Sequence, residues 1–208
     1  MTENWEPKTE LGRKVKNGEI TNFEQIYKYR KPILEHEIVE KLLPRMEEEK
    51  IDVMRVTRVT DSGRKFSLNI TVAVGDKNGH VGIGEQKGRE YGPTIEKAVK
   101  NAKRNVQSIR RGCGSWECGC GEEHSIPLTV KGKEGSTEIT IKPAPKGTGI
   151  VAGETAKKIL KLAGIKDAWT KTRGKTRTNK NYGKATLKAL KQTREKRQKE
   201  KQKGEGKW

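Results

Sequence analysis

The sequence predicts a mixed α+β protein with two small domains, and three observations carry this prediction. Apolar residues alternate with polar ones over several short runs, which is typical of half-buried strands. They recur at three- and four-residue spacing over longer runs, which is typical of helices. A stretch rich in Gly and Cys near the middle of the chain separates two such groups. Because only 30% of the 208 residues are hydrophobic, each core must be small.

The first domain is expected over residues 33–111, after an amino-terminal arm. Residues 1–32 are polar and mixed in charge, and we expect an extended arm that holds one short helical turn at most. From Ile33 to Met46, after Pro32, the apolar positions fall on one face of a helix. This helix should pack on a sheet.

Three antiparallel strands should follow. Residues 51–60 are rich in Val and Thr, and apolar residues alternate from Phe66 to Val74 with Phe66 on the apolar face. Asp61–Gly63 joins these two strands, and Asn78-Gly79 leads to a third at His80–Ile83.

A second helix is expected from about Thr94 to Ile109, with Pro93 near its first turn. Its apolar side consists mostly of Ala, Val and Ile, and four basic residues gather on another side: Lys97, Lys100, Lys103 and Arg104. A basic amphipathic helix could instead bind an anionic membrane surface. Helices of that kind favour Trp, Phe and Leu, so we rank the membrane alternative low.

The second domain is expected over residues 124–192, after a Cys- and Gly-rich linker at 112–123. It should consist of a β-hairpin with alternation at 126–130 and 137–141, a helix through about Ala163 that Gly164 ends, a short strand at 167–171 and a last helix from Tyr182. The basic tail at 193–208 has almost nothing apolar, so we expect disorder there until it meets RNA.

The positive charge is concentrated beyond residue 50. The formal net charge is +19, and residues 1–50 hold 10 basic against 11 acidic residues. A positive field of this size attracts polyanions, and neutralising phosphates releases condensed counterions. Nucleic acid is therefore the leading partner, and most ordinary metabolic enzymes are excluded as a first hypothesis. No run approaches the roughly 20 apolar residues that cross a bilayer and no secretory signal is evident, so we expect a cytoplasmic protein.

Several motifs, in this order along about residues 51–192, closely resemble the family of small ribosomal subunit protein five. They are Gly63-Arg64-Lys65-Phe66, Val74-Gly75-Asp76, Asn78-Gly79-His80-Val81-Gly82, Lys142-Pro143-Ala144-Pro145, Gly147-Thr148-Gly149 and Leu162-Ala163-Gly164-Ile165-Lys166-Asp167. Two segments, 110–116 and 169–172, resemble the archaeal branch. Bacterial members have a more basic hairpin loop where this chain has Thr60-Asp61-Ser62-Gly63.

The resemblance implies an α+β fold with an amino-terminal domain similar to a double-stranded-RNA-binding fold (αβββα). It implies a carboxy-terminal βαβα domain with a left-handed crossover, shared with a superfamily of small-molecule kinases. It also implies a structural component of the small ribosomal subunit that binds ribosomal RNA near the decoding region and the messenger entry channel. Its implied neighbours are small-subunit proteins four and eight, and its implied roles are subunit assembly and translational accuracy.

Long basic side chains on turns and helix faces can reach phosphates without disturbing the core, and we expect RNA contact from them. The alternative for each is a solvated surface. The protein should recognise the backbone and shape of the RNA rather than single bases. Phe66 lies on the apolar face of its predicted strand, so its ring is not expected to stack on bases. The expected RNA-binding residues are Arg55, Arg58, Arg64, Lys65, Lys77, Lys97, Lys100, Lys103, Arg104, Arg110, Arg111, Lys142, Lys146, Lys171, Arg173, Lys175, Arg177 and Lys180.

Gly147-Thr148-Gly149 could direct backbone N–H groups at an anion, assisted by Lys146. It lacks the Gly-Lys-Ser/Thr ending of a nucleotide-binding P-loop. An RNA phosphate, a protein contact and a tight structural turn all stay open.

All three cysteines of the chain lie within 12 residues together with one histidine. Cys113, Cys118, Cys120 and His124 could complete a tetrahedral zinc site, with glycines that let the chain fold round it. The spacing is not the usual paired Cys-x2-Cys, and the alternative is reduced thiols on a loop. No ligand position is left open for catalysis, and no cofactor is required.

No nucleophile with a base and no pair of carboxylates in an apolar pocket stands out, so we expect a protein that is not an enzyme. The chief alternative is a free-standing double-stranded-RNA-binding protein, and a small-molecule kinase comes third.

Overall fold

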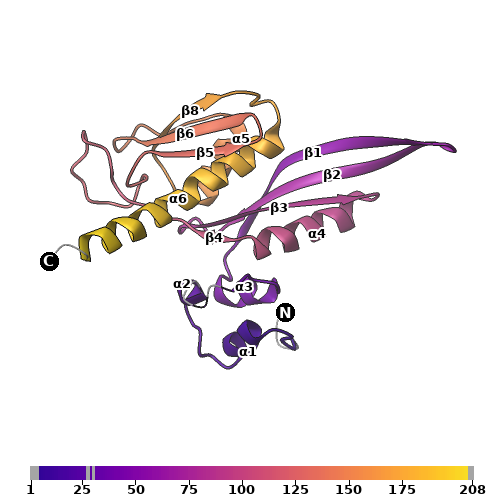
Figure 1. Ribbon diagram of the computed structural model, residues 1–208, viewed down its shortest axis with the longest axis horizontal. Coiled ribbons are helices and arrows are strands. Elements are labelled where there is room, and N and C mark those ends of the chain that lie inside the picture. Colours follow the sequence, from indigo (N-terminus) through magenta and orange to yellow (C-terminus); the bar gives the residue numbers. More distant parts are fainter. Residues whose placement is uncertain (1–4, 27–28, 30, 206–208) are drawn as a thin grey trace. The chain divides into compact units, whose positions relative to one another are not determined.

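The computed structural model describes residues 5–26, 29 and 31–205, with side chains through Arg194. The chain divides into two compact units, one formed by 1–76 and 82–106 and the other by 77–81 and 107–208. The expected α+β class is confirmed, because each unit combines a sheet with helices (Figure 1). None of the described helices is long and apolar enough to cross a bilayer. The predicted ends of the domains, the linker and the tail stay predictions.

The first unit is built on strands β1 (Glu47–Thr60), β2 (Gly63–Gly75) and β3 (His80–Gly88), followed by helix α4 (Tyr91–Arg104). The strand order is β1-β2-β3-β4, and the pairs β1–β2 and β3–β4 are antiparallel. Strand β4 (Gln107–Ser108), which the sequence did not predict, belongs to the second unit and pairs with His80 and Val81. Helix α4 packs directly on β3: a Cβ added at Gly84 would lie 2.2 Å from backbone atoms of Ala98 and Ala102.

The helix predicted over 33–46 is shorter than expected. Helix α3 spans Glu37–Leu42, and Leu43 has an extended φ of −128°. Pro44 explains the early end, because its ring disfavours the helical conformation of the residue before it. The chain then enters β1 at Glu47, so Met46 is not helical.

The arm is not extended where the structure describes it. Helices α1 (Glu10–Lys16) and α2 (Phe23–Ile26) form in it, and Thr9 caps α1 by accepting a hydrogen bond from the Gly12 N–H. Their apolar side chains, among them Leu11, Val15 and Phe23, join the core that β2 and α4 form. The expectation of an extended arm overlooked these few apolar residues, whose burial stabilises the two short helices.

The second unit contains a four-stranded sheet in the order β5-β6-β8-β7. Its strands are β5 (Val130–Glu134), β6 (Thr137–Pro143), β7 (Ile150–Val151) and β8 (Ala168–Arg173). Strands β7 and β8 are parallel, and α5 (Glu154–Leu162) connects them, whereas the other pairs are antiparallel. The handedness of this crossover remains an implication of the family resemblance.

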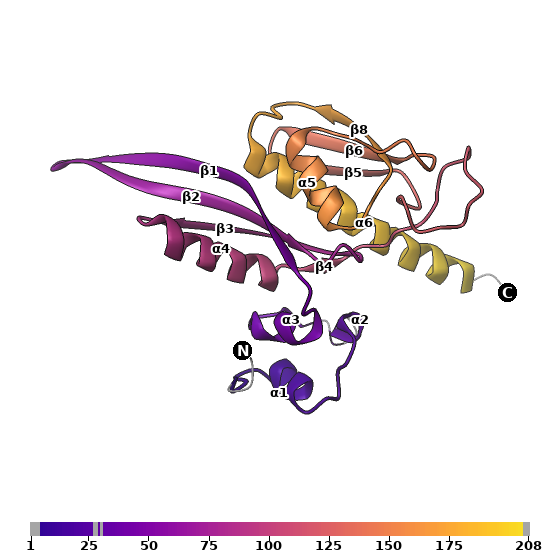
Figure 2. The ribbon, with the colours of Figure 1, turned by 180° about the vertical axis from the view of Figure 1, so that it is seen from behind.

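One long helix, α6 (Asn179–Glu205), covers one face of this sheet with α5 beside it (Figure 2). The approach is close, because a Cβ at Gly132 would lie 2.1 Å from the Ala185 carbonyl oxygen. The backbone of the basic tail continues this helix to Glu205, where we expected disorder. Lys, Arg, Gln and Glu are good helix formers and can extend a helix whose beginning is already packed.

Candidate nucleic-acid interface and metal centre

The tip of the β1–β2 hairpin presents basic side chains in register. Arg58 faces Lys65 across the two strands, Arg64 pairs with Val59, and all three basic residues are exposed. The hairpin projects past β3 and α4 (Figure 1), so neither of these two elements covers its end. The phosphate backbone of a nucleic acid could therefore approach this tip from either face of the two-stranded ribbon.

Phe66 lies on this projecting part and is 47% exposed, so the apolar face on which it was predicted is not buried at this end of β2. The guanidinium of Arg55 stacks 3.9 Å from the centroid of its ring. Burial along β2 does not alternate as predicted: residues 63–66 are exposed, 67–69 are half-buried, and 70–75 are all buried, the polar Thr71 included. An exposed cation and ring together can contact both phosphates and bases.

Three of the four basic residues expected on the second helix are exposed on α4: Lys97, Lys100 and Arg104. Lys103 differs. Its ammonium lies 3.0 Å from a carboxylate oxygen of Glu40 and 3.5 Å from one of Glu48, and its side chain is 15% exposed. The charge of Lys103 is therefore engaged within the protein.

The open face of the second sheet is basic. Lys142 lies beside Trp169 across β6 and β8, and Lys171 and Arg173 follow on the same strand, all exposed. Sequence reasoning missed three residues of this face: Lys131, Lys133 and Trp169. Their period of two, opposite the buried Val130 and Gly132, was the signal. Lys133 pairs with Glu138 at 3.1 Å, so its charge is partly neutralised.

The predicted strand at 167–171 and the predicted helix from Tyr182 leave a basic segment between them, and the observed loop there is shorter than this segment. Its first residues belong to β8, and α6 begins at Asn179, which leaves 174–178 as the loop. Lys175 and Arg177 are exposed on this loop, and Lys180 is half-buried on the first turn of α6.

A hollow of about 660 Å³ in the second unit is lined by five basic residues and three others. They are Lys77, Arg111, Lys157, Lys161, Lys166, Ile150, Gly164 and Ile165. Only Lys77 and Arg111 were expected at an interface. Arg111 donates to the Asn78 side chain at 2.6 Å and pairs with Glu123 at 3.3 Å, which holds it in place, while Arg110 beside it is exposed.

The Gly147-Thr148-Gly149 turn does hold an anion through its N–H groups, and that anion is a carboxylate of the protein itself. Gly147 and Gly149 both donate to Asp167 Oδ1, at 3.1 and 2.8 Å. The turn precedes β7, and α5 begins only at Glu154. Both amides are thus already used, which favours the structural turn among the alternatives.

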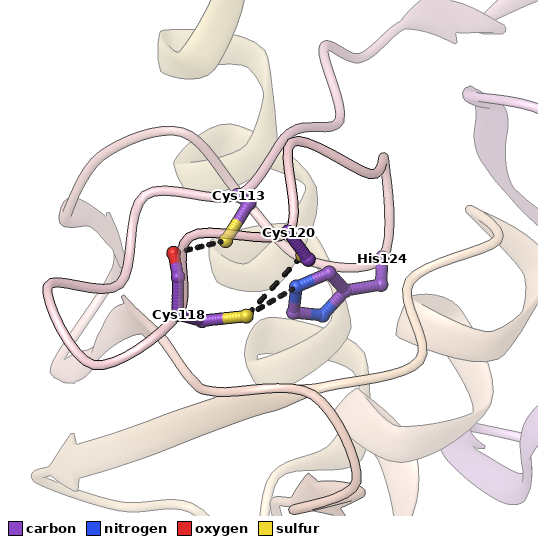
Figure 3. A group of neighbouring side chains, drawn as sticks. All are labelled: Cys113, Cys118, Cys120 and His124. Carbon is purple, nitrogen blue, oxygen red and sulfur yellow. Dashed lines mark hydrogen bonds between the residues drawn. The ribbon is translucent and has the colours of Figure 1, made fainter.

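The structure brings all three cysteines and His124 together (Figure 3). Their four candidate ligand atoms lie within 4.8 Å of one another. Cys118 Sγ is 3.2 Å from Cys120 Sγ and 3.8 Å from His124 Nε2. Tetrahedral zinc at about 2.3 Å from sulfur needs ligand atoms roughly 3.5–3.8 Å apart, so small shifts would complete a site.

The surroundings of His124 fix the orientation of its ring. Its ring is buried, and Nδ1 lies 2.8 Å from Asp167 Oδ2, also buried. A carboxylate that accepts a hydrogen bond from Nδ1–H keeps the proton on Nδ1, so the lone pair of Nε2 faces the sulfurs.

The thiols differ in their surroundings. The backbone N–H groups of Lys146 and Cys120 lower the pKa of Cys118 to about 6. Burial and then the neighbouring Cys118 raise the pKa of Cys113. Of these two thiols, Cys118 therefore more readily provides the thiolate that a metal needs.

These features define a class of protein: a basic α+β protein with two units, exposed cations on a hairpin, a helix and a sheet face, and a cluster of four candidate metal ligands. Comparisons with known proteins identify the family. The model for "Ribosomal protein S5, N-terminal domain" matches residues 46–110, and that for "Ribosomal protein S5, C-terminal domain" matches residues 132–203.

Curated relatives agree over nearly the whole chain. "Small ribosomal subunit protein uS5" of Methanocaldococcus jannaschii is 56% identical over 187 residues, which cover 90% of this chain and 86% of the relative. The protein of the same name from Aeropyrum pernix is 53% identical over 191 residues, covering 92% and 88%. The chain belongs to the ribosomal protein S5 family and is of the archaeal type. It is thus a ribosomal protein rather than an enzyme, as the sequence predicted.

Proposed function

We propose that this protein is a structural component of the small ribosomal subunit, in the cytoplasm, where it binds ribosomal RNA. Its position would be near the decoding region and the messenger entry channel, with messenger RNA nearby and small-subunit proteins four and eight as neighbours. There it supports subunit assembly and translational accuracy. The names of its relatives support the first part of this proposal, and the family resemblance supports the rest.

One observation carries the proposal for RNA: exposed cations lie on three surfaces of regular structure. They occupy the tip of β1–β2, one side of α4 and the open face of β5, β6 and β8. Rigid elements hold these charges at fixed spacings, which suits the shape and phosphate backbone of a folded RNA. Lys103, Arg111 and Lys146 contribute less, because each is paired with a carboxylate of the protein.

Sedimentation tests the proposal. We expect the tagged protein to migrate with the small subunit in a sucrose gradient and to stay there after a high-salt wash. Depletion of the protein should reduce the amount of mature small subunits. Binding to free RNA without any association with the subunit would instead support a free-standing RNA-binding protein.

We also propose that Cys113, Cys118, Cys120 and His124 hold one structural zinc ion. Three sulfurs and one imidazole form the donor set that zinc prefers in closed tetrahedral sites. Since all four ligands come from the protein, the ion would stabilise the loop and would not take part in catalysis.

The zinc proposal is tested by elemental analysis of protein purified without added metal. We expect one zinc per chain, and less than a tenth of that in Cys118→Ser. Ser115→Ala in the same loop is the matched control and should retain the ion. Cobalt loading should give the absorption of tetrahedral cobalt–thiolate coordination. Equal zinc content in Cys118→Ser and Ser115→Ala would contradict the proposal.

A further inference from the structure

The segment from Lys146 to Gly149 lies beside the loop that carries the candidate metal ligands. The backbone N–H of Lys146 is the largest of the influences that lower the pKa of the Cys118 thiol, which places this N–H beside the sulfur. The Lys146 ammonium lies 2.8 Å from a carboxylate oxygen of Glu122. In the sequence, Glu122 lies between the candidate ligands Cys120 and His124. This segment therefore lies against a proposed metal ligand and is also tied to the loop that carries the ligands.

Asp167 connects the same segment to the fourth ligand. One of its carboxylate oxygens accepts from the N–H groups of Gly147 and Gly149, and the other lies 2.8 Å from His124 Nδ1. Asp167 is only 4% exposed, so its charge depends on these three donors. The φ angles of +92° at Gly147 and +75° at Gly149 let both amides converge on one oxygen.

The backbone fixes His124 and Asp167 relative to each other without any metal. The N–H groups of Lys166 and Asp167 donate to the His124 carbonyl oxygen at 2.8 and 3.1 Å. The Ser125 hydroxyl donates to the Asp167 carbonyl oxygen at 2.6 Å. The imidazole is therefore held in place by a rigid support, whereas the cysteines lie on a glycine-rich loop.

We infer that Asp167 and the segment 146–149 form the outer shell of the zinc site, with Asp167 as the positioning residue that orients His124. This inference rests on the proposed zinc ion. A metal on Nε2 makes the Nδ1 proton more acidic and strengthens its bond to the carboxylate, so ion and loop stabilise each other. Zinc thereby orders residues 146–149 as well as the cysteine loop.

The first test measures zinc affinity by competition with a chromogenic chelator. Outer-shell carboxylates on zinc-bound histidines contribute about 10–100-fold to affinity, and we expect a loss of that size for Asp167→Asn. Glu117→Gln is the control, because it removes an exposed carboxylate of the same loop, and it should change the affinity less than about threefold. Asp167→Glu should recover part of the loss, because the charge is restored.

The second test uses the unaltered protein and avoids variants that fail to fold. Amide hydrogen exchange is followed by NMR with zinc bound and after its removal by a chelator. We expect protection at Lys146, Gly147 and Gly149 to fall at least tenfold on removal, with no change in β1. Unchanged protection at these amides, or full zinc affinity in Asp167→Asn, would overturn the inference while leaving the zinc site intact. A wild-type protein that binds no zinc would overturn both proposals.

Discussion

The open face of the second sheet makes a quantitative prediction for RNA binding. Lys171 and Arg173 are exposed on β8, and the hydrogen-bonding pattern places Lys171 opposite Thr140 and Arg173 opposite Glu138. If each neutralises one phosphate, each adds roughly 0.7–0.9 to the slope of log affinity against log salt. The double variant Lys171→Gln/Arg173→Gln should therefore lower this slope by roughly 1.4–1.8. Between 50 and 200 mM salt, the variant should lose about tenfold less affinity than the wild type.

Fluorescence anisotropy with labelled small-subunit ribosomal RNA, over a series of potassium chloride concentrations, measures the slope. The matched control is Lys158→Gln/Lys188→Gln, which removes the same net charge from α5 and α6. Both of these lysines pair with glutamates, Lys158 with Glu154 at 3.6 Å and Lys188 with Glu134. Equal slopes for the two double variants would refute the assignment of this face and leave only a general effect of net charge.

Two other predictions separate packing from RNA contact. Gly132→Ala should lower the free energy of unfolding by about 1–3 kcal/mol in a urea titration, because the new Cβ would collide with the Ala185 carbonyl oxygen. Gly92→Ala is the control and should not lower it, because a Cβ at this position would meet nothing within 4 Å. Lys103→Met should cost about 1 kcal/mol of stability and change RNA affinity less than twofold, because Lys103 pairs with Glu40 and Glu48. Lys100→Met should reduce RNA affinity about threefold with unchanged stability, and the opposite pattern in this pair would contradict the placement of α4.

The predictable parts of the fold are those in which a periodic pattern continues over a whole element. Strand β2 and helix α5 were predicted near their observed positions, because alternation or helical spacing runs through each of them. Helix α4 was predicted to end at Ile109, but it ends at Arg104 and residues 107–108 form β4. The helix over 33–46 was extended too far, since Pro44 outweighs the apolar spacing around it. The amino-terminal helices were missed because each has only a few apolar residues. Their burial stabilises a helix only when the rest of the core is folded.

The candidate metal site shows the same division. The ligand set was evident from three cysteines and a histidine close together in sequence, because short spacing limits how far apart they can fold. Asp167 could not be found in this way. It lies 43 residues from His124 along the chain, and only the pairing of distant segments brings the carboxylate to the imidazole.

By itself, the sequence determined the α+β class, the excess of positive charge beyond residue 50, the membership of the chain in its family and the four candidate metal ligands. These follow from local composition, periodicity and order, which act along the chain. Only the tertiary structure decided which cations are free and which are paired, that Phe66 is exposed, and that the amides of Gly147 and Gly149 bind Asp167. These contacts join residues that are far apart in the sequence. Packing of the folded chain brings such residues together, and a local sequence pattern cannot predict which of them will meet.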